Sequence, residues 1–241
     1  MCDYGVLDYV DSGEGVNVLF LHGWGANKNS WGNLVSLQDD FHIWRIDLWG
    51  FGCTLAPTKV VGTHEYALGV TDFIKNVIKD RVVLIGHSFG GKVAIDVASQ
   101  TNLVSGLVLI DSAGVKPRFS LRRAIALQKY KRLKRKVAKG KMPKYVLEKF
   151  GSRDYQQATG IMRSVLVRVV NEDILPLAKI LRVPTLILWG RQDDTTPLYM
   201  AKTLHKTIAN SRLCVVKGGH FSFLDSDVLS QIYKFLESRD D

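Results

Sequence analysis

The chain has 241 residues, of which 46% are hydrophobic and 23% are charged, a composition typical of one globular domain with room for an insertion. The formal net charge is +10, and the three cysteines lack C-x-x-C spacing, which argues against a disulfide framework and a zinc site. The start does not resemble a secretory leader, and no apolar run approaches the roughly 18 residues that span a bilayer, so we expect a cytoplasmic protein without a transmembrane segment.

In the first half of the chain, short apolar strands alternate with helices. The expected strands cover residues 4–10, 18–21, 41–46, 81–85 and 103–110. The expected helices run from about residue 29 to 37, from 63 to 78 with Thr63 as the cap, and from 92 to 99. Because strands that are apolar throughout are buried on both faces, this order predicts a mostly parallel sheet with helices on each side.

Residues 114–181 have a different character, because no apolar strand is expected there. One helical stripe is formed by Ala126, Tyr130, Leu133 and Val137. A second helical pattern is expected within 155–171, and residues 173–176 are typical of a boundary. This segment is therefore predicted to be an inserted helical lid.

After the lid, strands alternate with helices again. Strands are expected at 183–188 and 213–216, with a helix near 199–207 and a last helix that ends near residue 236. The sequence therefore predicts an α/β core made of residues 1–113 and 182–241, interrupted by the lid at residues 114–181.

The positive charge is concentrated in the expected lid. Fourteen of the 33 Lys and Arg residues lie between Lys116 and Lys149, together with a single acidic residue. The positive charge of this stretch therefore exceeds the net charge of the whole chain. Three interpretations stay open: a solvated helix face, a docking surface for an acidic protein or substrate, and a site for nucleic acid or anionic membrane. Nucleic acid is not expected, because few aromatic residues, Tyr130 and Tyr145, interleave with the basic ones and no nucleic-acid motif accompanies them.

The hexapeptide Gly86–Gly91 carries the strongest chemical signal. It lies between an expected strand and an expected helix, and a strand that turns directly into a helix needs small residues, which Gly86 and Gly90 supply. Ser88 is then left exposed at the apex, next to the helix N-terminus. The same residues would also form a glycine-rich turn with a capping serine. The assignment of Ser88 as a nucleophile therefore depends on finding the other triad residues elsewhere in the chain.

A serine nucleophile needs a base and a carboxylate that orients the base. Asp193 follows the strand that ends at residue 188, and His220 follows the strand that ends at residue 216. Because the carboxyl ends of parallel strands meet at one edge of a sheet, we expect both side chains beside Ser88. The sequence therefore predicts a catalytic triad of Ser88, Asp193 and His220.

Other carboxylates and histidines compete for these roles. Asp194 is better suited to capping the following turn, and Asp111 also follows a strand, with turn formation as its ordinary role. His87 lies within the serine turn and cannot easily fold back on its own neighbour. The other histidines fall on expected elements away from the loop edge and are interpreted as structural or surface residues: His42, His64 and His205.

Two backbone N–H groups are candidates for an oxyanion hole. Phe89 follows Ser88 at the start of a helix, and Trp24 lies in the loop His22–Gly25, which follows the first buried strand. That loop could be a tight turn with a core aromatic residue, but its place in the chain favours a position against the serine turn. We expect the amides of Trp24 and Phe89 to bind the oxyanion.

Four motifs follow one another along the chain: His22–Gly25, Gly86–Gly91, Gly190–Asp193 and Gly219–His220. With them the chain resembles the α/β-hydrolase family over its entire length, and residues 47–52 resemble the family's D-x-P-G-x-G loop with Trp49 in place of proline. The resemblance implies the α/β-hydrolase fold and ester hydrolysis without a metal or an organic cofactor. Haloalkane dehalogenases and epoxide hydrolases are disfavoured, because they require a carboxylate where Ser88 stands.

Within this family, His22–Asn27 followed by Trp31 resembles the esterases that remove the methyl group from pimeloyl-acyl-carrier-protein methyl ester. That resemblance implies a small ester substrate and an acidic carrier protein as a partner of the basic lid. Carbon–carbon bond hydrolases and thioesterases use the same scaffold, and some relatives that keep the triad act as ligand receptors or signalling proteins. We expect a serine esterase that acts through an acyl-enzyme, with these classes as alternatives.

Overall fold

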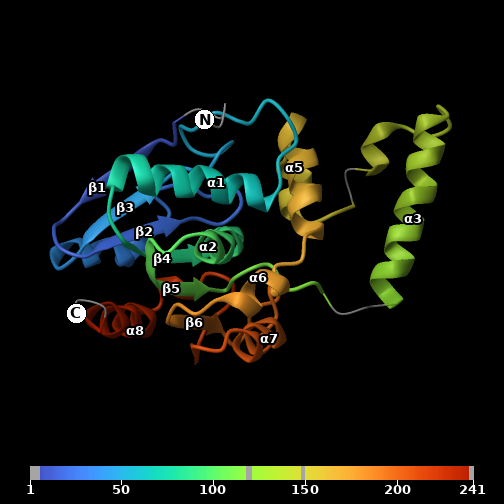
Figure 1. The fold of residues 1–241 in the computed structure, drawn as a ribbon. Helices are drawn as coiled ribbons and strands as arrows, with labels where there is room; N and C mark the ends of the chain where they lie inside the picture. Colours follow the sequence, from blue (N-terminus) through green and yellow to red (C-terminus); the bar gives the residue numbers. More distant parts are fainter. Residues whose placement is uncertain (1–5, 118–120, 148–149, 239–241) are drawn as a thin grey trace.

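The computed structural model describes residues 6–117, 121–147 and 150–238. Its strands form one sheet in the order β1-β3-β2-β4-β5-β6-β7, in which β1 is antiparallel to β3 and every other pair is parallel (Figure 1). The strands span Tyr9–Ser12 (β1), Asn17–Leu21 (β2), His42–Ile46 (β3), Val82–His87 (β4), Val104–Ile110 (β5), Thr185–Gly190 (β6) and Ser211–Val216 (β7). The mostly parallel sheet that the sequence predicts is confirmed.

Helices cover both faces of this sheet. The helices of the core are the 3₁₀ helix Gly32–Asp39 (η1), Thr63–Phe73 (α1), its π-helical continuation Ile74–Ile78 (η2), Phe89–Gln100 (α2), Tyr199–Thr207 (α7), the 3₁₀ turn Ser222–Leu224 (η4) and Ser226–Glu237 (α8). Successive residues of β2 point to opposite faces: Leu19 packs on the side of α1, α2 and α7, while Phe20 packs on the side of η1 and α8. Each such fully buried side chain contributes about 1.5–3 kcal/mol of transfer free energy.

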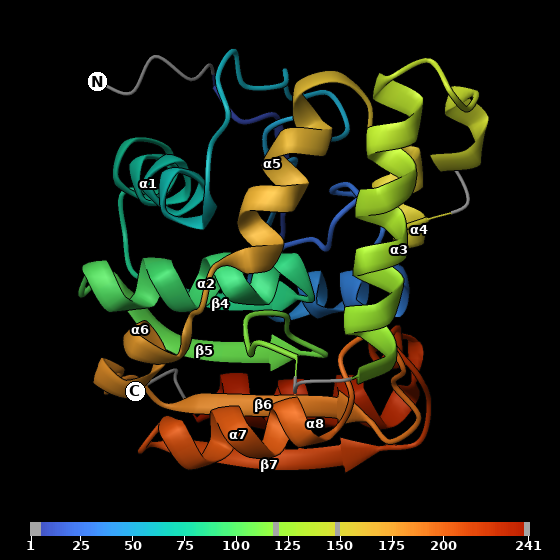
Figure 2. The same cartoon turned by 90° about the vertical axis from the view of Figure 1, so that its right-hand side faces the viewer.

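The segment between β5 and β6 is helical. It contains Leu121–Ala138 (α3), the 3₁₀ turn Lys144–Leu147 (η3), Arg153–Gln157 (α4), Gly160–Asn171 (α5) and Leu175–Ile180 (α6). Helix α5 buries Val165, Leu166 and Val169 against the main core, whereas α3 lies at the outside of the molecule, beyond α5 (Figures 1 and 2). One contact ties α3 to α4, because the hydroxyl groups of Tyr130 and Tyr155 lie 3.1 Å apart.

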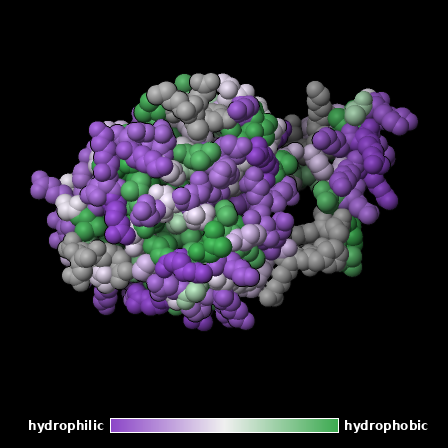
Figure 3. Space-filling model, in the orientation of Figure 1, coloured by the Kyte–Doolittle hydropathy of each residue, from purple (hydrophilic) through white to green (hydrophobic). Residues whose placement is uncertain are grey.

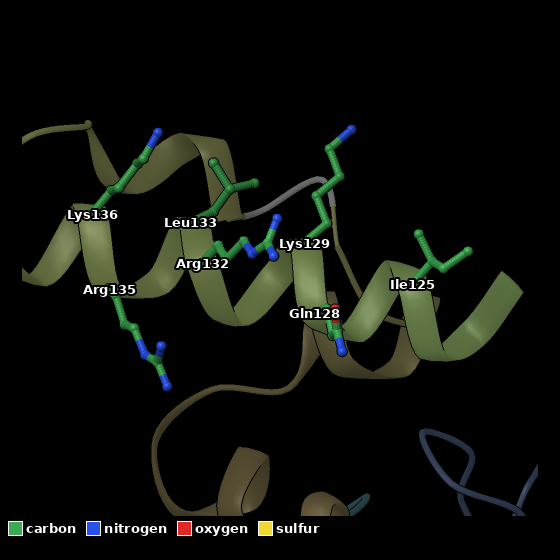
Figure 4. A pocket seen from close by; sticks show the side chains of 7 residues that line it. All are labelled: Ile125, Gln128, Lys129, Arg132, Leu133, Arg135 and Lys136. Atoms are coloured by element: carbon green, nitrogen blue, oxygen red, sulfur yellow. The ribbon is translucent and has the colours of Figure 1, made fainter. Parts of the chain in front are cut away.

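Helix α3 carries basic side chains on more than one side. Lys129, Lys131, Arg132, Lys134, Arg135 and Lys136 are all exposed. Figure 3 shows hydrophilic side chains over this part of the molecule. In Figure 4, Lys129 and Lys136 project from one side of α3 and Arg135 from the opposite side. The helix therefore presents positive charge to solvent, while Tyr130, Leu133 and Val137 of the expected apolar stripe are only half-buried.

Some expected elements differ from those observed. The edge strand covers Tyr9–Ser12, because it pairs only along β3, from Ile46 to Ile43. Residues 4 and 5 of the expected strand lie outside the described part. The expected helix over 29–37 is instead the 3₁₀ helix η1, in which Leu34 and Leu37 are buried three residues apart, the period of that helix.

The remaining differences concern helix starts. Gly62 caps α1, so Thr63 is the first helical residue and not the cap. Residues 173–176 are not only a boundary, since Pro176 lies in the first turn of α6, where its missing N–H costs no hydrogen bond. Within the described ranges, no helix is both long enough and apolar enough to cross a bilayer.

Candidate active site

The serine lies on a strained turn between β4 and α2. Ser88 has φ 50° and ψ −113°, a backbone conformation that L-residues adopt at a cost of about 1–3 kcal/mol. A side chain at Gly86 would approach the backbone of Gly91 to 2.6 Å, and one at Gly90 would overlap the carbonyl oxygen of Leu21. The glycines on either side of Ser88 therefore allow the turn to form against β2.

The structure brings the three expected triad residues together. His220 Nε2 lies 3.0 Å from Ser88 Oγ, and His220 Nδ1 lies 2.8 Å from Asp193 Oδ2. These side chains come from the loops after β4, β6 and β7, which end at one edge of the sheet. With Asp193 ionised, Nδ1–H donates to the carboxylate and Nε2 is free to accept the serine proton.

The Asp193 carboxylate is held by neighbours on its own loop. Oδ1 accepts hydrogen bonds from the amides of Thr195 and Thr196, both at 2.8 Å, and Oδ2 accepts one from Thr196 Oγ1 at 2.7 Å. Burial alone raises the pKa of Asp193, but hydrogen bonds from His220 and Thr196 outweigh it and keep the pKa below its usual value. Thr196 is not among the site residues expected from the sequence. Its only signal there is the Asp-Asp-Thr-Thr run, which is typical of an aspartate-capped turn.

Asp111 does not face His220. Its Oδ1 accepts a hydrogen bond from the amide of Gly190 at 2.8 Å, and its Oδ2 accepts from the amide and hydroxyl of Ser222, at 3.1 and 2.6 Å. Asp111 therefore joins the loop of Asp193 to the loop of His220. This arrangement supports Asp193 rather than Asp111 as the partner of the histidine.

The loop after β2 packs directly on the serine turn. A Cβ atom added to Gly23 would lie 2.8 Å from His87 Nδ1 and 3.3 Å from Ser88 Cβ. Gly23 is therefore in close contact with the serine turn, and Trp24 is the next residue along the chain. The rings of Trp24 and Phe89 meet with centroids 5.5 Å apart, and both residues line one cavity with Ser88. The two expected oxyanion donors thus lie on segments that meet beside the nucleophile.

Two buried histidines support this arrangement in the neutral form. His22 donates from Nδ1 to the carbonyl of Gly23 at 2.8 Å and accepts at Nε2 from the amide of Leu48 at 3.0 Å. His87 donates from Nε2 to the carbonyl of His220 at 2.7 Å. Burial lowers the pKa of His22 to about 4 and that of His87 to about 3, so neither carries charge at neutral pH.

The cavity beside Ser88 has a volume of about 340 Å³, within the usual range for small-molecule sites. Val115, Leu166 and Val169 contribute apolar wall from the segment between β5 and β6, and Met200 adds more from α7. The ionisable side chains in the wall are Lys92, Asp154 and Glu172.

One group of side chains outside the cavity has the composition of a metal site. The potential ligand atoms of Asp8, Asp47 and Cys53 all lie within 4.8 Å of one another. Lys28 Nζ, however, lies 2.5 Å from Asp8 and 2.8 Å from Asp47, so an ammonium group already neutralises the carboxylates. Hydrogen bonds to Asp47 and Asp8 raise the pKa of Lys28, which keeps it charged. The group is best explained as an ion-pair cluster.

A family model described as "Alpha/beta hydrolase family" matches residues 18–232. An uncharacterized protein of Mycobacterium tuberculosis is 27% identical to this chain over 251 residues, which cover 89% of this chain and 72% of that protein. The pimeloyl-[acyl-carrier protein] methyl ester esterase of Wigglesworthia glossinidia brevipalpis is 24% identical, and the match covers 89% of this chain and 90% of that enzyme.

The fold is also similar to that of solved structures. A thermophilic esterase from Thermogutta terrifontis matches with a TM-score of 0.72 at 22% sequence identity, over 98% of this chain and 94% of that chain. At this level of identity the similarity concerns the fold and not the substrate.

Proposed function

The chain belongs to the alpha/beta hydrolase family, and on that basis we propose that it is a serine hydrolase of carboxylic esters. The observation that carries the proposal is the pair of contacts that link Asp193 through His220 to Ser88, at 2.8 and 3.0 Å, in the wall of a cavity. In this arrangement the imidazole of His220, oriented by Asp193, is sufficient to activate the Ser88 hydroxyl.

In the proposed mechanism, Ser88 Oγ attacks the ester carbonyl while His220 Nε2 accepts the hydroxyl proton. Asp193 orients the imidazole and stabilises the imidazolium that forms. The amides of Trp24 and Phe89 donate to the oxyanion of the tetrahedral intermediate. His220 then protonates the departing alcohol as the carbon–oxygen bond breaks, and a water molecule activated by His220 releases the acid from Ser88.

We propose that the segment 114–181 acts as a lid over this site. Val115, Pro117, Asp154, Leu166 and Val169 of this segment line the same cavity as Ser88. An ester bound at the serine would therefore be enclosed in part by the insertion, which would limit the access of bulk water to the reacting carbonyl.

The proposal is tested by turnover of short p-nitrophenyl esters. Ser88→Ala and His220→Ala are each expected to lower kcat by about 10⁴-fold or more, and Asp193→Asn by somewhat less. Ser99→Ala is the matched control, because Ser99 lies on the same helix α2 and bonds to the carbonyl of Asp96. A single burst without further turnover, or Ser88→Ala activity equal to that of the wild type, would favour a receptor or another chemistry.

A specific observation also favours a carrier-borne ester as the substrate. The relative from Wigglesworthia glossinidia brevipalpis acts, by its name, on pimeloyl-[acyl-carrier protein] methyl ester. The exposed basic residues of α3, from Lys129 to Lys136, provide a surface complementary to an acidic protein. We therefore propose an acidic carrier protein as a candidate partner of α3.

A further inference from the structure

One buried lysine in the cavity wall has no role in the mechanism above. Lys92 lies on α2, four residues after Ser88, and is only 2% exposed. It lines the same cavity as Ser88 and Phe89. Because residues three apart lie on one face of a helix, Lys92 shares the face of α2 that carries Phe89, whose amide is the proposed oxyanion donor.

The ammonium group of Lys92 is bound by carbonyl groups alone. It donates to the carbonyl oxygen of Val169 and to that of Glu172, the latter at 2.9 Å. In the described parts of the chain, no carboxylate lies within ion-pair distance of Lys92 Nζ. An ammonium group has three N–H donors, so one of them finds no acceptor among the residues that the structure describes.

The carboxylate of Glu172, whose backbone carbonyl binds Lys92, is engaged elsewhere. The Glu172 carboxylate accepts hydrogen bonds from the amide and the hydroxyl of Thr63, the amide at 2.9 Å, and lies 3.4 Å from Arg168 Nε. It therefore neutralises Arg168 and holds the start of α1 instead of pairing with Lys92. Three acidic groups, Glu172, Asp173 and Asp96, act on Lys92 only through space, as does the basic Lys116.

Within the described ranges, this arrangement leaves a buried positive charge without a directly bound counter-ion. Buried charges in proteins are normally paired, because the cost of removing them from water must be offset. Burial lowers the pKa of Lys92 to about 8, which leaves the amine mostly protonated at neutral pH. A ligand carboxylate in the cavity would supply both the missing acceptor and the missing negative charge.

We propose that Lys92 binds a carboxylate on the acyl part of the substrate, so that the preferred esters are hemiesters of dicarboxylic acids. This inference rests on the proposed esterase function and specifies its substrate class. It is an alternative to the carrier-borne ester above, because a dicarboxylic acyl chain that is linked to a carrier at its far end offers Lys92 no free carboxylate. The acyl part is favoured over the alcohol because Lys92 and Phe89 share a helix face, whereas the alcohol must leave next to His220.

The test compares matched substrates: p-nitrophenyl hydrogen adipate, pimelate and suberate against the corresponding p-nitrophenyl methyl diesters, which lack the free carboxylate. Wild type is expected to have a higher kcat/KM for the acid, mainly through KM. Lys92→Met should lower the acid-to-neutral ratio by about 10- to 100-fold, as expected for a lost charge-assisted hydrogen bond, and Lys92→Arg should keep part of it.

The matched control is Lys116→Met, which removes an exposed charge that also acts on Lys92. An equal loss in this control, or an unchanged ratio in Lys92→Met, would overturn the proposal. Because the ratio is measured within one variant, partial loss of folded protein does not affect it.

Binding to the inactive enzyme provides a second measurement. Calorimetry with Ser88→Ala should give tighter binding of monomethyl adipate than of methyl hexanoate, and the Ser88→Ala/Lys92→Met double variant should lose that preference. Turnover of neither substrate class by wild type would contradict the esterase function itself. Turnover of both classes with equal efficiency, and no binding preference, would contradict only the role of Lys92.

Discussion

His87 joins the serine turn to the loop of the candidate base. Its Nε2 donates to the backbone carbonyl of His220 at 2.7 Å, and its ring centroid lies 5.0 Å from that of His220. The ring also packs against Phe223 and limits the space at Gly23. One neutral side chain thus positions the base relative to Ser88 without reaching the reacting atoms.

Removal of this hydrogen bond should reduce the rate more than substrate binding. We expect His87→Leu to lower kcat by about 10-fold with little change in KM, because a small displacement of the base affects proton transfer most. His87→Gln places an amide donor where Nε2 lies and should restore much of the activity. Steady-state kinetics on a p-nitrophenyl ester measure both values; a rise in KM with unchanged kcat would show that His87 shapes the cavity instead.

At the scale of elements, the end of α5 is fastened to the start of α1. Glu172, just after α5, accepts two hydrogen bonds from Thr63, and Arg168 of α5 lies 3.0 Å from Glu65 of α1. The carboxylate of Glu172 also faces the positive end of the α1 dipole. These contacts, with Lys92 on the carbonyls of the same turn, set the position of the cavity wall.

The Glu172→Gln substitution tests this junction. A neutral amide binds the Thr63 donors more weakly and no longer pairs with Arg168, so we expect the free energy of unfolding to fall by about 1–2 kcal/mol. Urea denaturation measures the change, with Glu14→Gln as the control because Glu14 is an exposed carboxylate. A loss below about 0.5 kcal/mol would mean that apolar packing of α5 alone holds the junction.

At the scale of the whole molecule, the distribution of charge is strongly asymmetric. The net charge of +10 arises from the segment between Lys116 and Lys149, and the exposed part of it on α3 lies at the periphery of the molecule (Figure 1). Charge at the periphery acts on association with a partner and not on the chemistry at Ser88. Its effect is screened over about 10 Å at 0.1 M salt.

Charge reversal on α3 separates an effect on association with a partner from an effect on the chemistry at Ser88. The variant with Arg132, Lys134, Arg135 and Lys136 replaced by Glu is expected to raise KM for a carrier-protein ester at low salt, while turnover of small p-nitrophenyl esters stays unchanged. The control reverses four exposed lysines elsewhere: Lys179, Lys202, Lys206 and Lys217. Equal activity of the α3 variant and wild type on carrier-borne esters at every salt concentration would leave the basic face as a solvated surface.

The sequence by itself determined the fold class and the order of the candidate site residues. Apolar strands alternating with helices require a sheet buried on both faces, and the chemistry of Ser88 requires specific residue types at the ends of its strands. The α/β-hydrolase fold expected from these motifs is confirmed by the family model over residues 18–232. The catalytic roles, the lid and the cellular compartment stay predictions.

The tertiary structure decided what depends on residues far apart in the chain. Asp111 and Asp193 both follow strands, and only the fold shows that Asp193 contacts His220 while Asp111 binds the loops around it. Likewise, the local sequence around Lys92 indicates only an ordinary helical residue. The segment at the end of α5, about 80 residues later in the chain, buries Lys92 beside the cavity. Local patterns specify elements, whereas burial and the choice of hydrogen-bond partner are properties of the packed chain.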